Sequence, residues 1–278
     1  MGPIMPEGPE IRRAADKIAS VLEGQVVESV KFGIPRLRRY NKVLTGNQVT
    51  RLETRGKALL THFDNDWSIY SHNQLYGVWK VVKRGKLPAT NRSLRLALHT
   101  TSHSALLYSA SDISVWPSAE INQHPFLQRI GPDILDQELH WRDIAGRLLE
   151  PPFRRRTLAT LYLDQAYMAG IGNYLRSEIL YAARLHPELR PESLGRGQLG
   201  ELARQTLSIS RRSYNTGGIT NPPRRAAALK KRGLSREKAR FAVFGRAGRP
   251  CHECGDEIQR VEANSRRLYF CPTCQVAN

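Results

Sequence analysis

The sequence lacks long apolar segments, and this absence limits where the protein can reside. No apolar run in its 278 residues approaches the roughly 18 that a membrane-spanning helix needs. The first eight residues, Met-Gly-Pro-Ile-Met-Pro-Glu-Gly, contain no hydrophobic stretch of the kind found in secretory signals. We therefore expect a soluble, cytoplasmic protein without a membrane partner.

Acidic residues are also scarce, since 25 Asp and Glu stand against 43 Lys and Arg, which leaves a net charge of +18. Such a surplus predicts a polyanionic partner, either nucleic acid or an anionic membrane surface. Hydrophobic residues at 40% and aromatics at 8% suffice for packed cores, so a wholly disordered basic protein is excluded. The length favours two modest domains and a small appendage.

Cysteine is rare and confined to the end of the chain. The four cysteines lie within the last 28 residues as two CxxC pairs, Cys251 with Cys254 and Cys271 with Cys274. This spacing is typical of a four-thiolate zinc site, and four thiolates leave no open position, so we expect one structural Zn²⁺. Two disulfides are the alternative, but they require an oxidising compartment. The tail is too small to have its own core, so the metal would hold it folded.

The hydrophobic pattern changes along the chain. Residues 10–22 have helical spacing, and from about 25 to 115 short alternating runs such as 94–98 predict strands of an antiparallel sandwich. Four later segments are typical of helices: 139–149, 157–168, 174–184 and 197–214. Because strands and helices are sequential rather than alternating, we predict an α+β multidomain protein.

The resulting division has five parts. They are an N-terminal extension or misassigned start, a β-sandwich domain, a helical domain, a basic linker or loop and a zinc hairpin, at 1–5, 6–122, 123–216, 217–243 and 244–278. Residues 204–249 contain thirteen Lys or Arg and one acid, Glu237. We interpret the middle of this stretch as a flexible basic loop that contacts phosphates, although a solvated loop without function has the same composition.

A glycine-containing turn joins two of the expected helices. Gly170 and Gly172 allow a ligand to approach the backbone closely, and the helix that follows offers free N–H groups to a phosphate. Asn173 and Arg176 are placed to add side-chain donors. Two glycines between helices also occur in ordinary tight turns.

Five motifs occur in one order along the chain, namely Pro6-Glu-Gly-Pro-Glu10, Thr54-Arg-Gly-Lys-Ala-Leu-Leu60, Ser71-His-Asn-Gln-Leu-Tyr-Gly77, the turn 170–176 and the paired CxxC. In this set the chain resembles the formamidopyrimidine-DNA glycosylase/endonuclease VIII family, and within it the endonuclease VIII branch. The resemblance implies a β-sandwich, a helix–two-turn–helix domain and a zinc hairpin. It also implies a DNA glycosylase and abasic-site lyase of base excision repair, bound to duplex DNA with oxidised bases or abasic sites and acting as a monomer.

The resemblance assigns catalytic roles to specific positions. Pro6, once it is the terminal residue, corresponds to the nucleophile that forms a Schiff base, and Glu7 to the proton donor. Glu10 and Lys57 complete the active site, with Lys57 as a proton donor for elimination or a phosphate contact. Arg266 is the corresponding donor for δ-elimination or a phosphate contact, and Arg267 is the less favoured alternative.

DNA contacts follow from the same resemblance. Base excision requires the nucleotide to leave the stack, and Gln74, Leu75 and Tyr76 match the family's wedge that fills the void. A β-turn with a buried Leu and Tyr would have the same local sequence. Asn173, Arg176 and Arg266 are expected to bind DNA, with Asn173 and Arg266 on the phosphates beside the flipped nucleotide.

The start of the chain departs from the family pattern. If translation begins at Met1, Pro6 is an internal tertiary amide with no nucleophilic lone pair. If it begins at Met5, removal of Met5 frees the Pro6 amine. We expect Met5 to be the start, because the other active-site residues are present.

Three alternatives remain open. An oxidised-purine glycosylase of the same family is one, because the 215–240 loop lies near where that class carries a lesion-covering loop. A non-catalytic damaged-DNA-binding zinc protein and a ribosomal or RNA-binding zinc protein would share the charge and the hairpin. The wedge motif and the Pro-Glu start argue against the last two of these, and the wedge motif with the likeness to the endonuclease VIII branch favours oxidised pyrimidines over purines.

Overall fold

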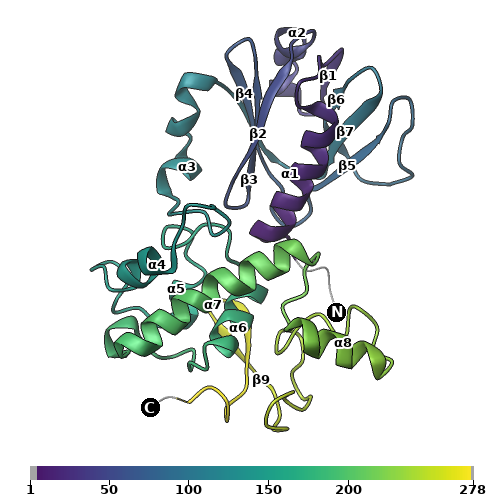
Figure 1. The fold of residues 1–278 in the computed structure, drawn as a ribbon. Coiled ribbons are helices and arrows are strands. Elements are labelled where there is room, and N and C mark those ends of the chain that lie inside the picture. The colour runs from purple at the N-terminus through teal and green to yellow at the C-terminus, as the bar shows by residue number, and fades with distance from the viewer. Residues whose placement is uncertain (1–4, 277–278) are drawn as a thin grey trace. The chain divides into compact units, whose positions relative to one another are not determined.

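The computed structural model describes residues 5–276, which divide into two compact units (Figure 1). The N-terminal unit contains residues 5–6 and 10–129, and the C-terminal unit contains residues 7–9 and 130–276. Within residues 5–276, no helix is long and apolar enough to cross a membrane.

The N-terminal unit is a sandwich of two four-stranded antiparallel sheets, ordered β2-β3-β4-β8 and β1-β6-β7-β5. The strands are β1 Ser29–Phe32, β2 Val49–Arg55, β3 Ala58–Phe63, β4 Trp67–His72, β5 Val78–Lys83, β6 Leu94–His99, β7 His103–Tyr108 and β8 Asp112–Pro117. Leu96 and Leu98 of β6 are fully buried between the sheets, as the alternation predicted. Apolar residues from both sheets form one continuous core.

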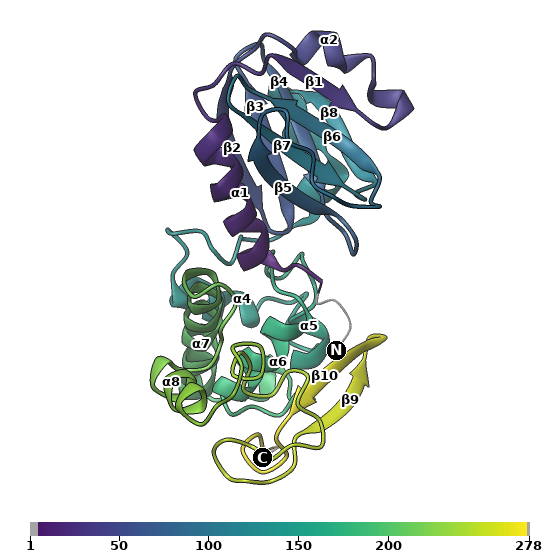
Figure 2. The same cartoon turned by 90° about the vertical axis from the view of Figure 1, so that its right-hand side faces the viewer.

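Helices border this sandwich. They are α1 Gly8–Leu22, α2 Tyr40–Leu44 and α3 Pro125–Arg129, with short 3₁₀ helices at Pro35–Leu37 and Ser118–Gln123. Ala15, Ile18 and Leu22 of α1 are buried in the sandwich core, and α1 lies along one side of the strands (Figures 1 and 2). The helical spacing of residues 10–22 is thereby confirmed.

Two connections cross between the sheets at the same end of the sandwich. The loop 73–77 runs from β4 to β5, and the loop 109–111 returns from β7 to β8. Register pairs His72 with Asp112 and Val78 with Tyr108. Because both ends of one loop are paired with both ends of the other, the two loops lie side by side.

The C-terminal unit consists of helices and one β-hairpin. Its elements are α4 Trp141–Leu148, α5 Leu158–Leu161, α6 Asn173–Ala182, a 3₁₀ helix Pro191–Ser193, α7 Arg196–Asn215, α8 Pro223–Lys231, β9 Gln259–Ala263 and β10 Arg266–Phe270. Helix α6 is buried from Tyr174 to Tyr181. It packs against α7 on one side and β10 on the other, an arrangement visible in Figure 2. The predicted fold class is confirmed.

One predicted helix is shorter than expected. Residues 157–168 were expected to be one helix, but α5 ends at Leu161. The Asp164 carboxylate accepts the Ala166 N–H at 2.8 Å and also pairs with Arg156. This local side-chain hydrogen bond competes with helix continuation.

The segment 217–243 was expected to be a flexible linker, yet it contains α8. Pro223 occupies the first helical turn, where its missing N–H has no cost, and Ala226–Ala228 favour a helix. Leu229 is buried beneath the helix. The many charged residues of this segment hid the helix, whose buried residue is Leu229.

Candidate active site and nucleic-acid interface

The carboxylate of Glu7 lies at the N-terminus of α6. Its oxygens accept the backbone N–H groups of Gly172 at 2.8 Å, Tyr174 at 2.7 Å and Leu175 at 3.2 Å. The residue is 2% exposed. The positive end of the helix dipole and three N–H donors fix the position of this negative charge.

The glycines of the adjoining turn make this approach possible. A Cβ on Gly172 would lie 2.4 Å from Glu7 Cδ. Gly170 has φ +97°, and its carbonyl accepts the Gly8 N–H at 2.8 Å, while a Cβ on Gly8 would lie 3.1 Å from Gly170 Cα. Residues 7–9 and 170–175 are therefore packed closely against one another.

Asn173 and Arg176 have different environments. Asn173 is partly exposed and accepts a hydrogen bond from Arg176 Nη2 at Oδ1, 2.7 Å away. Arg176 is fully buried, and Nη1 donates to the Ala159 carbonyl at 2.7 Å. Burial lowers the pKa of Arg176 to about 10, while the Glu7 charge raises it and Arg266 lowers it, so it stays protonated at neutral pH.

Arg176 was expected to bind DNA, and in this structure its side chain is fully buried. Its Nη1 and Nη2 groups donate within the protein, including a 3.5 Å contact from Nη2 to the Arg267 carbonyl of the hairpin. Its observed effect is to orient the Asn173 amide, whose Oδ1 is directed at the guanidinium. The Asn173 NH₂ group is thereby the donor that remains for a ligand.

The hairpin β9–β10 presents Arg266 beside this turn. Asn264 and Ser265 form its two-residue connection with φ +53° and +56°, a geometry typical of tight hairpins. Arg266 is exposed and opens β10 opposite Ala263. The hairpin is attached to α6 because the Tyr269 N–H donates to Ser177 Oγ at 3.3 Å.

The four cysteines fit one tetrahedral zinc ion. Their sulfur atoms all lie within 4.8 Å of one another, with Cys251 to Cys274 at 3.8 Å and Cys254 to Cys271 at 3.4 Å. Four bonds of about 2.3 Å to Zn²⁺ place sulfurs at such separations, whereas a disulfide requires about 2.05 Å. The Tyr181 hydroxyl lies 3.3 Å from Cys251 Sγ and adds an outer hydrogen bond.

Pro6, Glu10 and Lys57 belong to the N-terminal unit. Pro6 directly precedes Glu7 and is partly exposed. Glu10, in the first turn of α1, pairs with Arg13 at 3.1 Å. Lys57 lies in the tight turn between β2 and β3 and is partly buried; its charge contributes to lowering the pKa of His72, which burial lowers most.

The wedge motif occupies the β4–β5 loop. Leu75 is 41% exposed and Tyr76 is 63% exposed, so the alternative of a turn that buries both side chains is wrong. Gln74 has φ +52°, and its N–H donates to His72 Nδ1 at 3.0 Å. An exposed aliphatic side chain and an exposed ring at a loop tip can enter an opened base stack.

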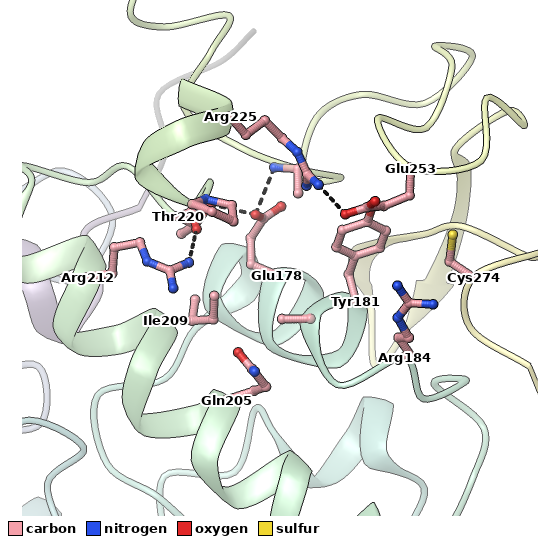
Figure 3. Close-up of a pocket in the computed structure, with 13 residues that line it drawn as sticks. Glu178, Tyr181, Arg184, Gln205, Ile209, Arg212, Thr220, Arg225, Glu253 and Cys274 are labelled. Carbon is pink, nitrogen blue, oxygen red and sulfur yellow. Dashed lines mark hydrogen bonds and ion pairs between the residues drawn. The ribbon is translucent and has the colours of Figure 1, made fainter. Parts of the chain in front are cut away.

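A second carboxylate, Glu178, organises the start and end of the basic segment (Figure 3). It accepts hydrogen bonds from Thr220 Oγ1 at 2.5 Å and from the N–H groups of residues 242, 243 and 244 at 2.8 Å each. Beside it lies a pocket of about 220 Å³ bordered by Arg184, Arg212 and Arg225. Cys274 is the one predicted site residue that lines this pocket.

Sequence reasoning missed Glu178, His72 and the positioning part of Arg176. Each acts through burial and through contacts with residues distant in sequence, which no local motif encodes. The available signal was the position of Glu178 directly before Ile179 and Leu180 in a segment expected to be a helix, since a carboxylate buried with such neighbours requires several donors.

Three domain families match the chain. They are the formamidopyrimidine-DNA glycosylase N-terminal domain at residues 5–111, the formamidopyrimidine-DNA glycosylase H2TH domain at 130–223 and the zinc finger found in FPG and IleRS at 248–276. With the sulfur geometry, the last match identifies the four cysteines as a zinc site.

Full-length relatives and solved structures agree with these matches. Endonuclease 8 of Pectobacterium atrosepticum is 49% identical over 271 residues, which cover 98% of this chain and 100% of that protein. Endonuclease 8 of Shigella sonnei is 48% identical with the same coverage. Lactococcus lactis Fpg in complex with DNA containing N7-benzyl-Fapy-dG superposes with a TM-score of 0.79 at 22% identity, covering 97% of this chain and 99% of that one; this likeness establishes the fold.

Proposed function

The chain belongs to the formamidopyrimidine-DNA glycosylase/endonuclease VIII family, and from this premise we propose that it is a DNA glycosylase and abasic-site lyase that removes oxidised pyrimidines from duplex DNA. The observation that carries the proposal is the Glu7 carboxylate, fixed by three N–H donors directly after Pro6. A buried, rigidly held acid beside a secondary amine suits nucleophilic attack on a sugar carbon.

We propose Pro6 as the nucleophile, with its α-amine freed by removal of the residues before it. The chain numbered from Met1 has an amide at this nitrogen. The match to the glycosylase domain begins at residue 5, which supports Met5 as the residue removed. A terminal α-amine has a pKa of about 8, roughly two units below that of lysine, so a useful fraction is neutral at pH 7.

The reaction proceeds in two stages. The Pro6 nitrogen bonds to C1′ of the damaged nucleotide and loses its proton, while the N-glycosidic bond breaks and the base leaves with the electron pair of that bond and takes up a proton. The C1′–O4′ bond then breaks, O4′ is protonated, and the nitrogen lone pair forms the C1′=N⁺ bond of an iminium. The resulting iminium acidifies the C2′ protons, so loss of one expels the 3′-phosphate by β-elimination, and the 5′-phosphate follows by δ-elimination.

The remaining polar groups have supporting roles in this proposal. Glu7 transfers protons during base excision, and Glu10 completes the active site. Lys57 donates a proton in elimination or contacts a phosphate. Arg266 does the same at the δ-elimination step. All four assignments rest on the family motif. They are supported by the three N–H donors that hold Glu7 and by the partial or full exposure of the other three side chains.

DNA is held at its backbone and at the void. Asn173 and Arg266, whose carrying elements α6 and β10 pack together, would bind the phosphates beside the flipped nucleotide. Gln74, Leu75 and Tyr76 would fill the space it leaves. The zinc ion, once bound, supplies only the fixed shape of the hairpin that presents Arg266.

The substrate class follows from the endonuclease 8 relatives, so we propose oxidised pyrimidines such as thymine glycol and 5-hydroxycytosine. Oxidised purines are the second candidate, because L. lactis Fpg, of the same fold, was solved with Fapy-dG-containing DNA. We further propose a monomer that acts in the bacterial cytoplasm on nucleoid DNA.

Borohydride trapping tests the proposal. A duplex with a single thymine glycol is incubated with the chain beginning at Pro6 and with the chain beginning at Met1, both under borohydride. A covalent protein–DNA band from the Pro6 form alone is expected, since only that form has a free secondary amine. A Pro6→Gly variant of the shorter form should lose most of the band.

Two outcomes would contradict the proposal. Equal bands from both forms would place the amine elsewhere, with Lys57 first to be tested by Lys57→Gln. No band and no strand cleavage from either form would leave a DNA-binding protein. Glu7→Gln separates the stages: it should stop excision of thymine glycol more than cleavage of a preformed abasic site.

A further inference from the structure

The wedge loop is held by a residue outside its own motif. Ser111, in the β7–β8 loop, donates its hydroxyl hydrogen to Gln74 Oε1 across 2.6 Å. The two loops lie side by side because His72 pairs with Asp112 and Val78 pairs with Tyr108. The contact is therefore a consequence of strand register rather than of chance proximity.

Other contacts fix the backbone of the same loop. The Gly77 N–H donates to the Asn73 carbonyl at 2.7 Å, and a Cβ on Gly77 would lie 2.5 Å from that oxygen. Arg92 Nη1 donates to the Tyr76 carbonyl at 2.6 Å. Because these contacts fix the backbone of the loop, the hydrogen bond from Ser111 acts on the side-chain torsions of Gln74.

We propose that Ser111 is a positioning residue for the wedge: its hydroxyl holds Gln74 Oε1, so that the Gln74 NH₂ group is presented to the base left unpaired when the damaged nucleotide is extruded. Within residues 5–276, Gln74 Nε2 donates to no protein acceptor, whereas Oε1 accepts the Ser111 hydrogen bond. The wedge thus offers an N–H donor, which suits acceptors on the opposing base such as adenine N1 or guanine O6.

Holding the amide lowers the entropic cost of filling the void. Gln loses considerable side-chain freedom when it is immobilised, and a preset orientation removes part of that loss from the insertion step. The inference rests on the proposed function, since an orphaned base exists only if a nucleotide is flipped. The inference assigns a role in void filling to Ser111, which lies outside the Gln-Leu-Tyr motif.

A double-mutant cycle tests it. On duplex DNA with an abasic site opposite adenine, Ser111→Ala should lower kcat/KM by about fivefold, the usual effect of one neutral hydrogen bond, and Ser111→Thr should restore it. If Ser111 acts only through Gln74, Gln74→Ala with Ser111→Ala should be no slower than Gln74→Ala alone. Cleavage of a single-stranded abasic oligonucleotide, which has no opposing base, should be unchanged by Ser111→Ala.

The control is Ser102→Ala, in the β6–β7 turn, where the hydroxyl contacts the neighbouring His103 ring. Wild-type rates for Ser111→Ala on duplex DNA, additive effects in the cycle, or an equal loss on single-stranded DNA would each overturn the inference. Failure of the wild-type chain beginning at Pro6 to cleave any abasic DNA would instead contradict the proposed function. The two failures are thus distinguishable.

Discussion

The absence of a Cβ atom at Gly172 allows the Glu7 carboxylate, the candidate catalytic group, to take its position. The Glu7 carboxylate occupies the space that a Cβ would take, and its side chain also accepts the Gly172 N–H. A larger residue would force either the carboxylate or the start of α6 to move. Because Glu7 is buried, it has no open space into which to shift.

We predict that Gly172→Ala lowers base excision by about 100-fold, the cost typical of a catalytic group displaced by about 1 Å. Excision of thymine glycol under single-turnover conditions measures this. Gly146→Ala in α4 is the matched control, since nothing lies within 4 Å of its added Cβ. Equal excision by the two variants would show that the Glu7 position is not critical.

At the scale of elements, the zinc hairpin depends on its metal for its shape. The buried residues around it, including Ile258 and Tyr269, form a small cluster with Tyr181 and Val243 of the helical unit. So small a core supplies little stability alone. We therefore expect the shape of the hairpin that carries Arg266 to depend on the metal, in addition to its contacts with α6.

Zinc removal should weaken DNA binding by about tenfold, the loss expected for one charge-assisted phosphate contact, while the strands of the sandwich stay folded. The measurement is duplex affinity and far-ultraviolet circular dichroism before and after chelation, with zinc added back as the control. Unchanged affinity in metal-free protein would show that Arg266 makes no such contact.

Exposed Arg224, Lys230 and Lys231 lie on helix α8, and exposed Arg232 follows it directly. Within residues 5–276, none of these four side chains forms an ion pair. Neutralising each one that meets a phosphate should reduce the slope of log affinity against log salt by about 0.9. We therefore expect a shallower slope when all four are changed to Gln. Arg224→Lys with Arg232→Lys keeps the charge and should keep the slope; an unchanged slope in the four-Gln variant would exclude α8 as a DNA contact.

At the scale of the whole molecule, the sequence predicted a strand or a site correctly where the local pattern of residues was complete. The alternation of Leu94, Leu96 and Leu98 predicted β6, and the CxxC pairs predicted the zinc site. It failed where tertiary contacts decide: Asp164 ends α5 early, and nothing in the local sequence indicated that Arg176 is fully buried. The catalytic roles came from the family resemblance, because Glu7 and Lys57 have no distinguishing local pattern.

Folding stability should decrease as the pH falls below about 6.5. Burial lowers the pKa of His72 and of His124; Asp112 opposes both shifts, while Lys57 and Arg129 reinforce them respectively. The unfolded chain therefore binds more protons below its histidine pKa of about 6.5, so stability is lost as pH decreases. A second loss follows below about pH 4.5, because the His62 ring, 3.7 Å away, and the ion pairs with Arg55 and Arg51 lower the pKa of Glu53 to about 2.

Urea unfolding at pH 7.5, 6.5 and 5.5, followed by tryptophan fluorescence, measures the histidine effect. A variant with His72→Asn and His124→Asn should show a flatter dependence of unfolding free energy on pH than the wild type. Parallel curves would assign the dependence to other groups.

The attachment of residues 220 and 242–244 to Glu178 determines which part of the basic segment can be altered freely. Thr220 and residues 242–244 bind the same carboxylate, so both ends of the intervening stretch are anchored at one point on α6. Length and sequence between these anchors can then change without displacing Asn173 at the start of that helix. We expect this segment to tolerate replacement by grafting, because both of its ends stay bound to Glu178 while the turn before Asn173 keeps its place.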